Sequence, residues 1–112
     1  NITNATYTGY ENIVSQFTNA SDLAFNADGT KVYVVGFTAD AVGQYSLSTP
    51  YLISSAVYDS VSLDVSSKED NPKALAFSTD GTKLFVAGST NNKIIQYNFP
   101  KNWIGNQINV IV

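Results

Sequence analysis

Residues 23–45 read LAFNADGTKVYVVGFTADAVGQY, and residues 75–97 read LAFSTDGTKLFVAGSTNNKIIQY. The two stretches lie 52 positions apart, align without a gap and share 12 of 23 residues. A repeat of this length predicts one supersecondary unit that stacks on copies of itself. The chain holds two such units, whereas an array of this kind usually needs about three to bury its apolar faces. The repeat therefore indicates an architecture and an assembly step, and says little about a ligand.

Apolar and polar residues alternate with a period of two through most of the chain, which predicts strands rather than helices. The expected strands cover residues 23–25, 31–36, 42–47, 56–65, 73–77, 83–88 and 93–99. Asp28-Gly29 and Asp80-Gly81 read as tight turns, since glycine accepts a positive φ and aspartate binds nearby backbone amides. The polar run at 66–72 is expected to be the loop between the two units.

Composition limits the function classes. The 112 residues predict a single domain, and 44% hydrophobic content is enough for a packed core. A net charge of −3 gives no reason to expect nucleic acid as a partner. The chain has no cysteine and no histidine, which removes the thiolate metal site, the commonest general base and the commonest metal ligand. No apolar stretch reaches the roughly 18 residues of a membrane span. We therefore expect no catalytic residues, no metal, no cofactor and no membrane partner.

Both termini carry further strand-like segments. Residues 2–7 (ITNATY) echo residues 53–58 (ISSAVY), which lead into the fourth strand of the first unit. The N-terminus is therefore expected to be a fourth strand with no preceding unit of its own. Residues 107–112 (QINVIV) form a second alternating segment near the C-terminus.

The repeated residues resemble the YVTN-type repeats of β-propellers, and their longer-period relatives in phage and marine viruses. The motif is Phe-x-x-Asp-Gly-Thr-Lys, then a Tyr/Phe-Val-x-Gly strand, then Gln-Tyr. The matching residues are Phe25, Asp28, Gly29, Thr30, Lys31, Tyr33, Val34, Gly36, Gln44 and Tyr45, and their second copies Phe77, Asp80, Gly81, Thr82, Lys83, Phe85, Val86, Gly88, Gln96 and Tyr97. The resemblance implies an all-β fold of two four-stranded propeller blades per chain. Residues 1–15 would be an orphan outer strand, 20–65 the first blade and 72–112 the second.

A unit of two blades would leave two large apolar faces exposed, and such faces drive association. Propellers typically have about 4–8 blades. Self-association into a ring would therefore use two, three or four chains, and we expect the trimer of six blades. Closure has two alternatives: residues 5–14 add to a neighbour's second blade, or residues 107–112 fill that place within the same chain. Deletion of residues 1–15 separates the two alternatives.

The best candidate for a binding site is a polar rim formed by loops that follow the second and fourth strands of the blades. Its residues are Lys68, Glu69, Asp70, Asn71, Asp40, Asn91 and Asn92. The rim would recognise a polar ligand such as a glycan or a protein, and the alternative is a set of solvated loops. Glu69 and Asp70 as a catalytic pair is unsupported, because neighbouring loop residues do not define a fixed separation.

Other charged positions have simpler interpretations. The turns at Asp28 and Asp80 each offer one carboxylate, whereas a calcium site needs about six oxygens. Both are therefore expected to be structural. Asp22 and Lys73 lie near the start of the inner strands, where we expect paired charge around a central tunnel.

The expected role is a non-enzymatic structural or binding module, plausible in a viral or extracellular particle, although the sequence leaves its location undetermined. One alternative is a lactonase-like propeller enzyme, since the YVTN resemblance extends loosely to such proteins. Those enzymes gather acidic residues and histidine around a metal, and this chain has no histidine. Another alternative is a propeller fragment without an evolved activity of its own.

Overall fold

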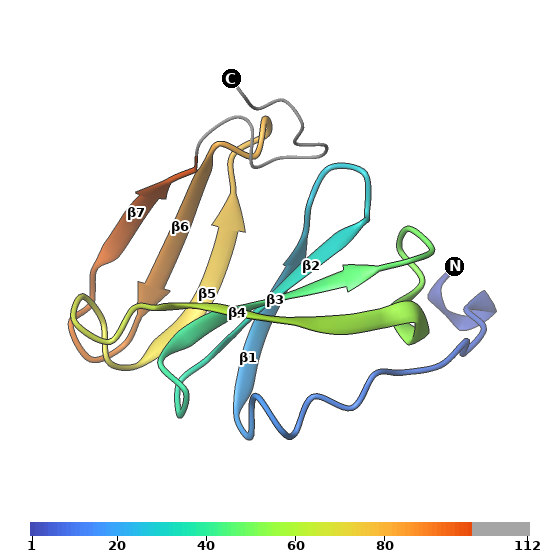
Figure 1. The fold of residues 1–112 in the computed structure, drawn as a ribbon, viewed down its shortest axis with the longest axis horizontal. Helices are drawn as coiled ribbons and strands as arrows, with labels where there is room; N and C mark the ends of the chain where they lie inside the picture. Colours follow the sequence, from blue (N-terminus) through green and yellow to red (C-terminus); the bar gives the residue numbers. More distant parts are fainter. Residues whose placement is uncertain (100–112) are drawn as a thin grey trace.

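The computed structural model describes residues 1–99, which fold into two antiparallel β-sheets (Figure 1). The first sheet has the order β1-β2-β3-β4 and the second has the order β5-β6-β7. The elements are η1 (Ile2–Asn4), β1 (Ala20–Phe25), β2 (Lys31–Gly36), β3 (Ala41–Leu47), η2 (Ile53–Ser55), β4 (Ala56–Asp64), β5 (Pro72–Phe77), β6 (Lys83–Gly88) and β7 (Ile94–Asn98). The all-β fold class is confirmed, as are the seven strands expected between residues 23 and 99. The strand expected within residues 1–15 is not formed in this chain.

The two sheets have the same strand register, displaced by 52 residues. In the first sheet Leu23 pairs with Val34, and in the second Leu75 pairs with Val86. The irregularity near the start of β1, between Ala20 and Asp22, recurs in β5. The second and third strands of each sheet also pair in the same register. The sequence repeat is therefore a repeat of backbone pairing, because register determines which side chains face each neighbour.

The Asp-Gly turns connect the first two strands of each sheet, as expected. Asp28 Oδ1 accepts hydrogen bonds from the amide and the hydroxyl of Thr30, at 3.1 and 2.6 Å. Asp80 Oδ1 accepts the same pair from Thr82 at 3.0 and 2.7 Å. Gly29 and Gly81 have φ of 76° and 74°, in the region that favours glycine. These contacts agree with a structural role of both aspartates in their turns.

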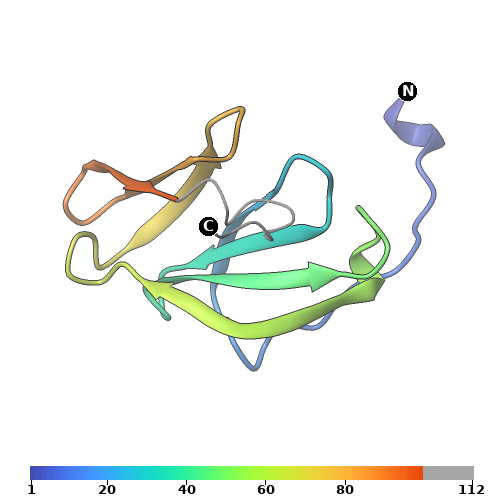
Figure 2. The ribbon, with the colours of Figure 1, turned by 45° about the horizontal axis from the view of Figure 1, so that its top comes forward.

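The main core lies between the two sheets, which pack face to face (Figure 2). Its buried residues are Tyr33, Val35, Val42, Val65, Leu75, Leu84 and Val86. Asp22 also joins the sheets, since its Oδ2 accepts a hydrogen bond from the amide of Leu75 at 3.0 Å. The amine of Lys73 lies 4.1 Å from the centre of the Phe37 ring. Asp22 and Lys73 thus have partners other than each other, and they lie within β1 and β5.

A second apolar cluster covers the opposite face of the first sheet. Its buried residues are Phe17, Val32, Val34, Tyr45, Leu47 and Ala56. The outward face of the second sheet is more open, since Ile94 is 77% exposed. A shallow groove of about 140 Å³ on this face is lined by apolar residues, and the alanines Ala74, Ala76 and Ala87 are among them. Apolar side chains therefore remain on an outward surface of the molecule.

Two details differ from the sequence-based expectation. Pro72 begins β5 instead of ending the loop, which is a position where a strand tolerates proline because the first residue need not donate to the ladder. The alternation predicted for β4 does not bury every apolar residue, since Val57 and Val61 are 66% and 52% exposed. They lie on a strand at the edge of the first sheet. The fourth strand expected for the second blade falls after residue 99, outside the described residues, as does the segment 107–112.

The N-terminal segment belongs to neither sheet. The 3-10 turn η1 is followed by residues 5–13 without strand or helix, up to the turn before Phe17. Both views place this terminus beside the first sheet, on the side away from β7 (Figures 1 and 2). Ile2, Tyr7 and Tyr10 are 87%, 78% and 69% exposed. No helix among residues 1–99 is long and apolar enough to cross a membrane.

Candidate functional site

The three loops expected to form a rim do lie together. The amide of Val65 donates to the carbonyl of Asp40 at 3.0 Å, which joins the loop after β4 to the turn between β2 and β3. The amide of Ser89 donates to the carbonyl of Asn71 at 3.2 Å, and the Asn71 side-chain amide donates to the Ser89 hydroxyl at 2.7 Å. These bonds join the same loop to the turn between β6 and β7. The candidate residues therefore come from three connected loops.

Glu69 occupies the interior of this loop cluster and is 0% exposed. Its carboxylate accepts hydrogen bonds from the amide of Asn91 at 3.2 and 3.3 Å and from the amide of Asn71 at 3.2 Å. A buried carboxylate is tolerated where such bonds replace water. Glu69 therefore supports the backbone of both loops and does not present its oxygens at the surface. It does not pair with Asp70, whose side chain is exposed.

Asp40 carries the clearest electrostatic perturbation of the rim. Burial raises the pKa of this carboxyl group, and the nearby charges of Asp70, Asp64 and Glu69 raise it further. Its Oδ1 atom is buried and makes no hydrogen bond within the described part of the chain. The backbone of Asp40 has φ of 53°, and Asn92, at the equivalent place in the second sheet, has φ of 56°. Both turns therefore use a residue type that accepts the left-handed region.

The outer surface of the rim is formed by exposed polar side chains. Lys68, Asp70, Asn91 and Asn92 are exposed, and Asn71 is half-buried. Among residues 1–99, no group of three or more acidic, histidine or cysteine side chains is arranged to hold a metal ion. This surface therefore carries an exposed cation, an exposed carboxylate and exposed amides.

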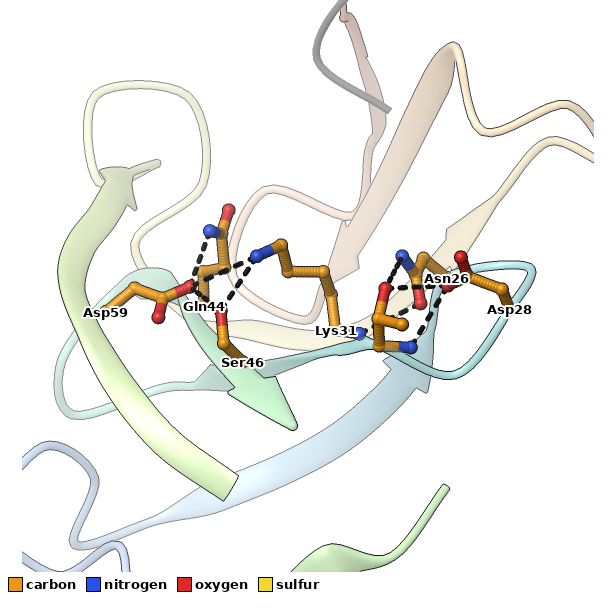
Figure 3. A network of polar contacts seen from close by, with 7 residues as sticks. Asn26, Asp28, Lys31, Gln44, Ser46 and Asp59 are labelled. Carbon is orange, nitrogen blue, oxygen red and sulfur yellow. Dashed lines mark hydrogen bonds and ion pairs between the residues drawn. The ribbon is translucent and has the colours of Figure 1, made fainter. Parts of the chain in front are cut away.

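A separate polar network lies on the face of the first sheet that looks toward the second (Figure 3). Lys31 Nζ donates to the hydroxyl of Ser46 at 2.7 Å and lies 3.9 Å from Asp59 Oδ2. The same carboxylate oxygen accepts hydrogen bonds from Gln44 at 2.7 Å and from Ser46 at 2.8 Å. The network joins β2, β3 and β4. Burial and the charge of Asp59 together raise the pKa of Tyr33.

A cavity of about 200 Å³ opens where the Asp-Gly turns of the two sheets approach each other. Aromatic residues and a few polar groups line it, including Phe25, Tyr33, Phe77, Lys31 and Asp80. Lys31 and Asp80 already form the bonds described above. The cavity is therefore a partly apolar recess between the sheets, away from the three-loop rim.

The structural role of Glu69 was not foreseen, although the repeat contains its signal. Residue 69 stands 52 positions after Phe17, which packs in the same place against the first sheet. A Cβ on Gly36 would lie 2.8 Å from the Phe17 ring, and one on Gly88 would lie 2.2 Å from Glu69 Cγ. Extension of the alignment upstream of Leu23 would have predicted a buried Glu69.

Comparison with known proteins identifies no relative of this chain. No family model, no curated protein and no solved structure matches this chain. The geometry of the two sheets, the three-loop rim and the outward apolar faces therefore carries the functional argument.

Proposed function

We propose that the chain is a non-enzymatic structural and binding module that assembles with two further copies into a six-bladed β-propeller. Each sheet would be one blade. The observation that carries the proposal is the packing of the two sheets: they have the same register and meet face to face through a core to which both contribute. Such a contact can be repeated by a third sheet, because each sheet has a second face.

The outward faces support association by their composition. On the first sheet, Leu23 is 53% exposed and stands where Leu75 stands in the second. Within the chain, Leu75 is buried against the first sheet. The equivalent contact for Leu23 would be the outward face of another chain's second sheet, where the groove lined by Ala74, Ala76 and Ala87 offers space. Contacts of this kind are heterologous and form a ring when the rotation closes.

The binding role rests on the three-loop rim. Lys68, Asp70 and Asn92 are exposed on loops whose backbones are braced by Glu69 and Asn71. Loops positioned by a rigid scaffold are common binding elements. The mixture of amides with charges of both signs favours a polar partner such as a glycan or a protein surface. A lactonase-like activity is the alternative, and the absence of histidine from the sequence argues against it.

Light scattering on the eluting peak of a size-exclusion column tests the assembly. A mass near three times 12.1 kDa is expected. A mass of 12.1 kDa at micromolar concentration would contradict the proposal and favour a fragment of a larger propeller. A mass of two or four chains would retain self-association but exclude six blades.

A glycan array and a pull-down with the Lys68→Ala/Asp70→Ala variant as control would test the rim. A specific signal that the variant loses is expected. Equal signal from both proteins would exclude these side chains as the binding surface. Turnover of a lactone substrate by the purified chain would favour the enzymatic alternative.

A further inference from the structure

We infer that residues 5–12 of one chain form the fourth strand of the second sheet of another chain, paired with β7 in a defined register. This inference rests on the proposed assembly and specifies how its chains are joined. Backbone hydrogen bonds along an added strand would provide affinity that face-to-face packing alone does not.

The N-terminal segment begins with the same kind of turn that leads into β4. η1 (Ile2–Asn4) and η2 (Ile53–Ser55) are 3-10 turns of the same length, 51 positions apart. After η2 the chain enters β4 at Ala56 with φ of −73° and ψ of 138°, and after η1 Ala5 has φ of −67° and ψ of 144°. Both alanine amides also donate to the first carbonyl of the turn. The N-terminal segment thus begins as β4 begins.

The N-terminal segment also ends with the same turn contacts as β4. β4 ends at Asp64, whose Oδ1 accepts a hydrogen bond from the amide of Ser66 at 2.8 Å. Asn12 Oδ1 accepts one from the amide of Val14 at 3.0 Å, 52 positions earlier. The following turns also coincide, since Phe17 donates to the carbonyl of Ile13 at 2.8 Å and Glu69 donates to that of Val65 at 2.9 Å. The segment 5–12 therefore starts and ends as β4 does, but it pairs with no strand among residues 1–99 of its own chain.

Within the described part of the chain, the second sheet has an unpaired edge. The second sheet ends at β7, whose one ladder partner in the described part of the chain is β6. In the first sheet the equivalent strand, β3, pairs on its other side with β4. The segment 5–12 does not reach β7 of its own chain, because the N-terminus lies on the far side of the first sheet (Figures 1 and 2). A second copy of the chain is the occupant that matches this edge.

The repeat also gives the register. Ser46 pairs with Val57 and Tyr45 with Tyr58 in the first sheet. Displacement by 52 residues on β3 and by 51 on β4 places Thr6 opposite Asn98 and Tyr7 opposite Tyr97. The rings of Tyr45 and Tyr58 lie 5.2 Å apart at a tilt of 50°, and aromatic pairs across strands stabilise a sheet. Tyr7, 78% exposed in its own chain, would stack in the same way on the partner subunit's Tyr97.

Between the tyrosine and the closing turn, the N-terminal segment is one residue shorter than β4. β4 contains an irregularity in this part, with Ser60 at φ of 61°. The segment has Gly9 at φ of 140° there. A glycine accommodates the local change of pairing that the missing residue requires. Beyond it, displacement of the pair Leu63 and Val42 by 52 residues places Glu11 opposite Ile94.

Disulfide trapping on the full chain tests the register, since the unsubstituted chain has no cysteine. The variant Thr6→Cys/Asn98→Cys is expected to give covalent oligomers on a non-reducing gel after mild oxidation. Thr6→Cys/Ser46→Cys is the matched control, because Ser46 is the equivalent of Asn98 in a sheet whose fourth place is already filled. Thr8→Cys/Asn98→Cys tests a slip of two residues. The mass of each reduced variant is measured by light scattering.

The outcomes separate this inference from the proposed assembly. Oligomers in solution together with trapping at 6 and 98, and weak trapping in both controls, would support both. Oligomers without trapping at 6 and 98, or with equal trapping in the controls, would overturn the strand exchange and leave the assembly intact. Trapping with a mass other than three chains would support the exchange and exclude the trimer. A reduced protein that is monomeric and does not trap would overturn both.

Tyr7→Ala should weaken assembly at least about tenfold, whereas Tyr7→Phe should retain it.

Discussion

At the scale of single residues, Asp40 combines a carboxyl group of raised pKa with a backbone of positive φ. Because burial and three acidic neighbours raise its pKa, the folded chain binds a proton at this site more readily than the unfolded chain does. Ionised Asp40 therefore lowers stability once the pH exceeds the ordinary aspartate value of about 4. The penalty grows as the pH rises through the raised pKa and is absent at lower pH.

Asp40→Asn should accordingly raise the melting temperature at pH 7, and the gain should shrink at pH 3. Asparagine also accepts a positive φ, as Asn92 shows at the equivalent turn, so a part of the gain independent of pH is expected. Asp28→Asn is the control with the opposite sign, because hydrogen bonds from Thr30 lower the pKa of Asp28. Thermal melts of the three proteins at both pH values check this. An equal gain at pH 7 and pH 3 would exclude the electrostatic explanation.

At the scale of elements, the loops before β1 and β5 each pack one side chain against their own sheet, and the two side chains differ. The Phe17 ring covers Gly43, where an added Cβ would lie 2.8 Å from the ring. In the second sheet Ile95 stands at the position of Gly43, and the smaller Glu69 replaces the phenylalanine. The two sheets therefore fill equivalent positions with different pairs of side chains.

Phe17→Glu should destabilise the chain because it leaves a cavity and places a carboxylate in an apolar cluster. Gly43→Ile should destabilise it by overpacking, at a cost of about 1–3 kcal/mol. The double variant should lose less than the sum of the two, because it recreates the arrangement of the second sheet. A double-mutant cycle from urea unfolding measures the coupling. Additive losses would show that the two positions do not compensate each other.

The Asp-Gly turns should act locally on their own hairpins. Asp80→Ala removes the acceptor of three hydrogen bonds, from Ser78 and Thr82, and should cost about 1 kcal/mol. Amide hydrogen exchange should quicken in β5 and β6 and remain unchanged in β1 and β2. Asp28→Ala should give the reverse pattern. A uniform change over both sheets would mean that the turns act on global stability alone.

At the scale of the whole molecule, the two sheets should unfold together, because they share one core. Leu84 is 1% exposed between them, and Leu84→Ala should cost about 2–5 kcal/mol. Urea transitions followed by circular dichroism and by tyrosine fluorescence should coincide in both proteins. Val57→Ala, at a 66% exposed position, is the control and should have little effect. Two separate transitions would show that the sheets fold independently.

How far each feature could be predicted depends on how local it is. The strands and the Asp-Gly turns follow from alternation and turn chemistry within a few residues, and the structure agrees with them. The gathering of the three loops was also expected, from the resemblance to propeller blades. The use of Glu69 as an internal support was missed, since its partners are amides of Asn71 and Asn91 brought to it by the packed loop.

The sequence by itself determined the all-β fold and the period of 52 residues, and that period requires equivalent pairing in the two sheets. It could do so because alternation and turn residues act between near neighbours. Only the tertiary structure decided that Asp22 binds the amide of Leu75, that Glu69 is buried and that residues 5–12 lie apart from β7. These features depend on contacts between segments distant in the chain, whose geometry is set by how the two sheets pack together.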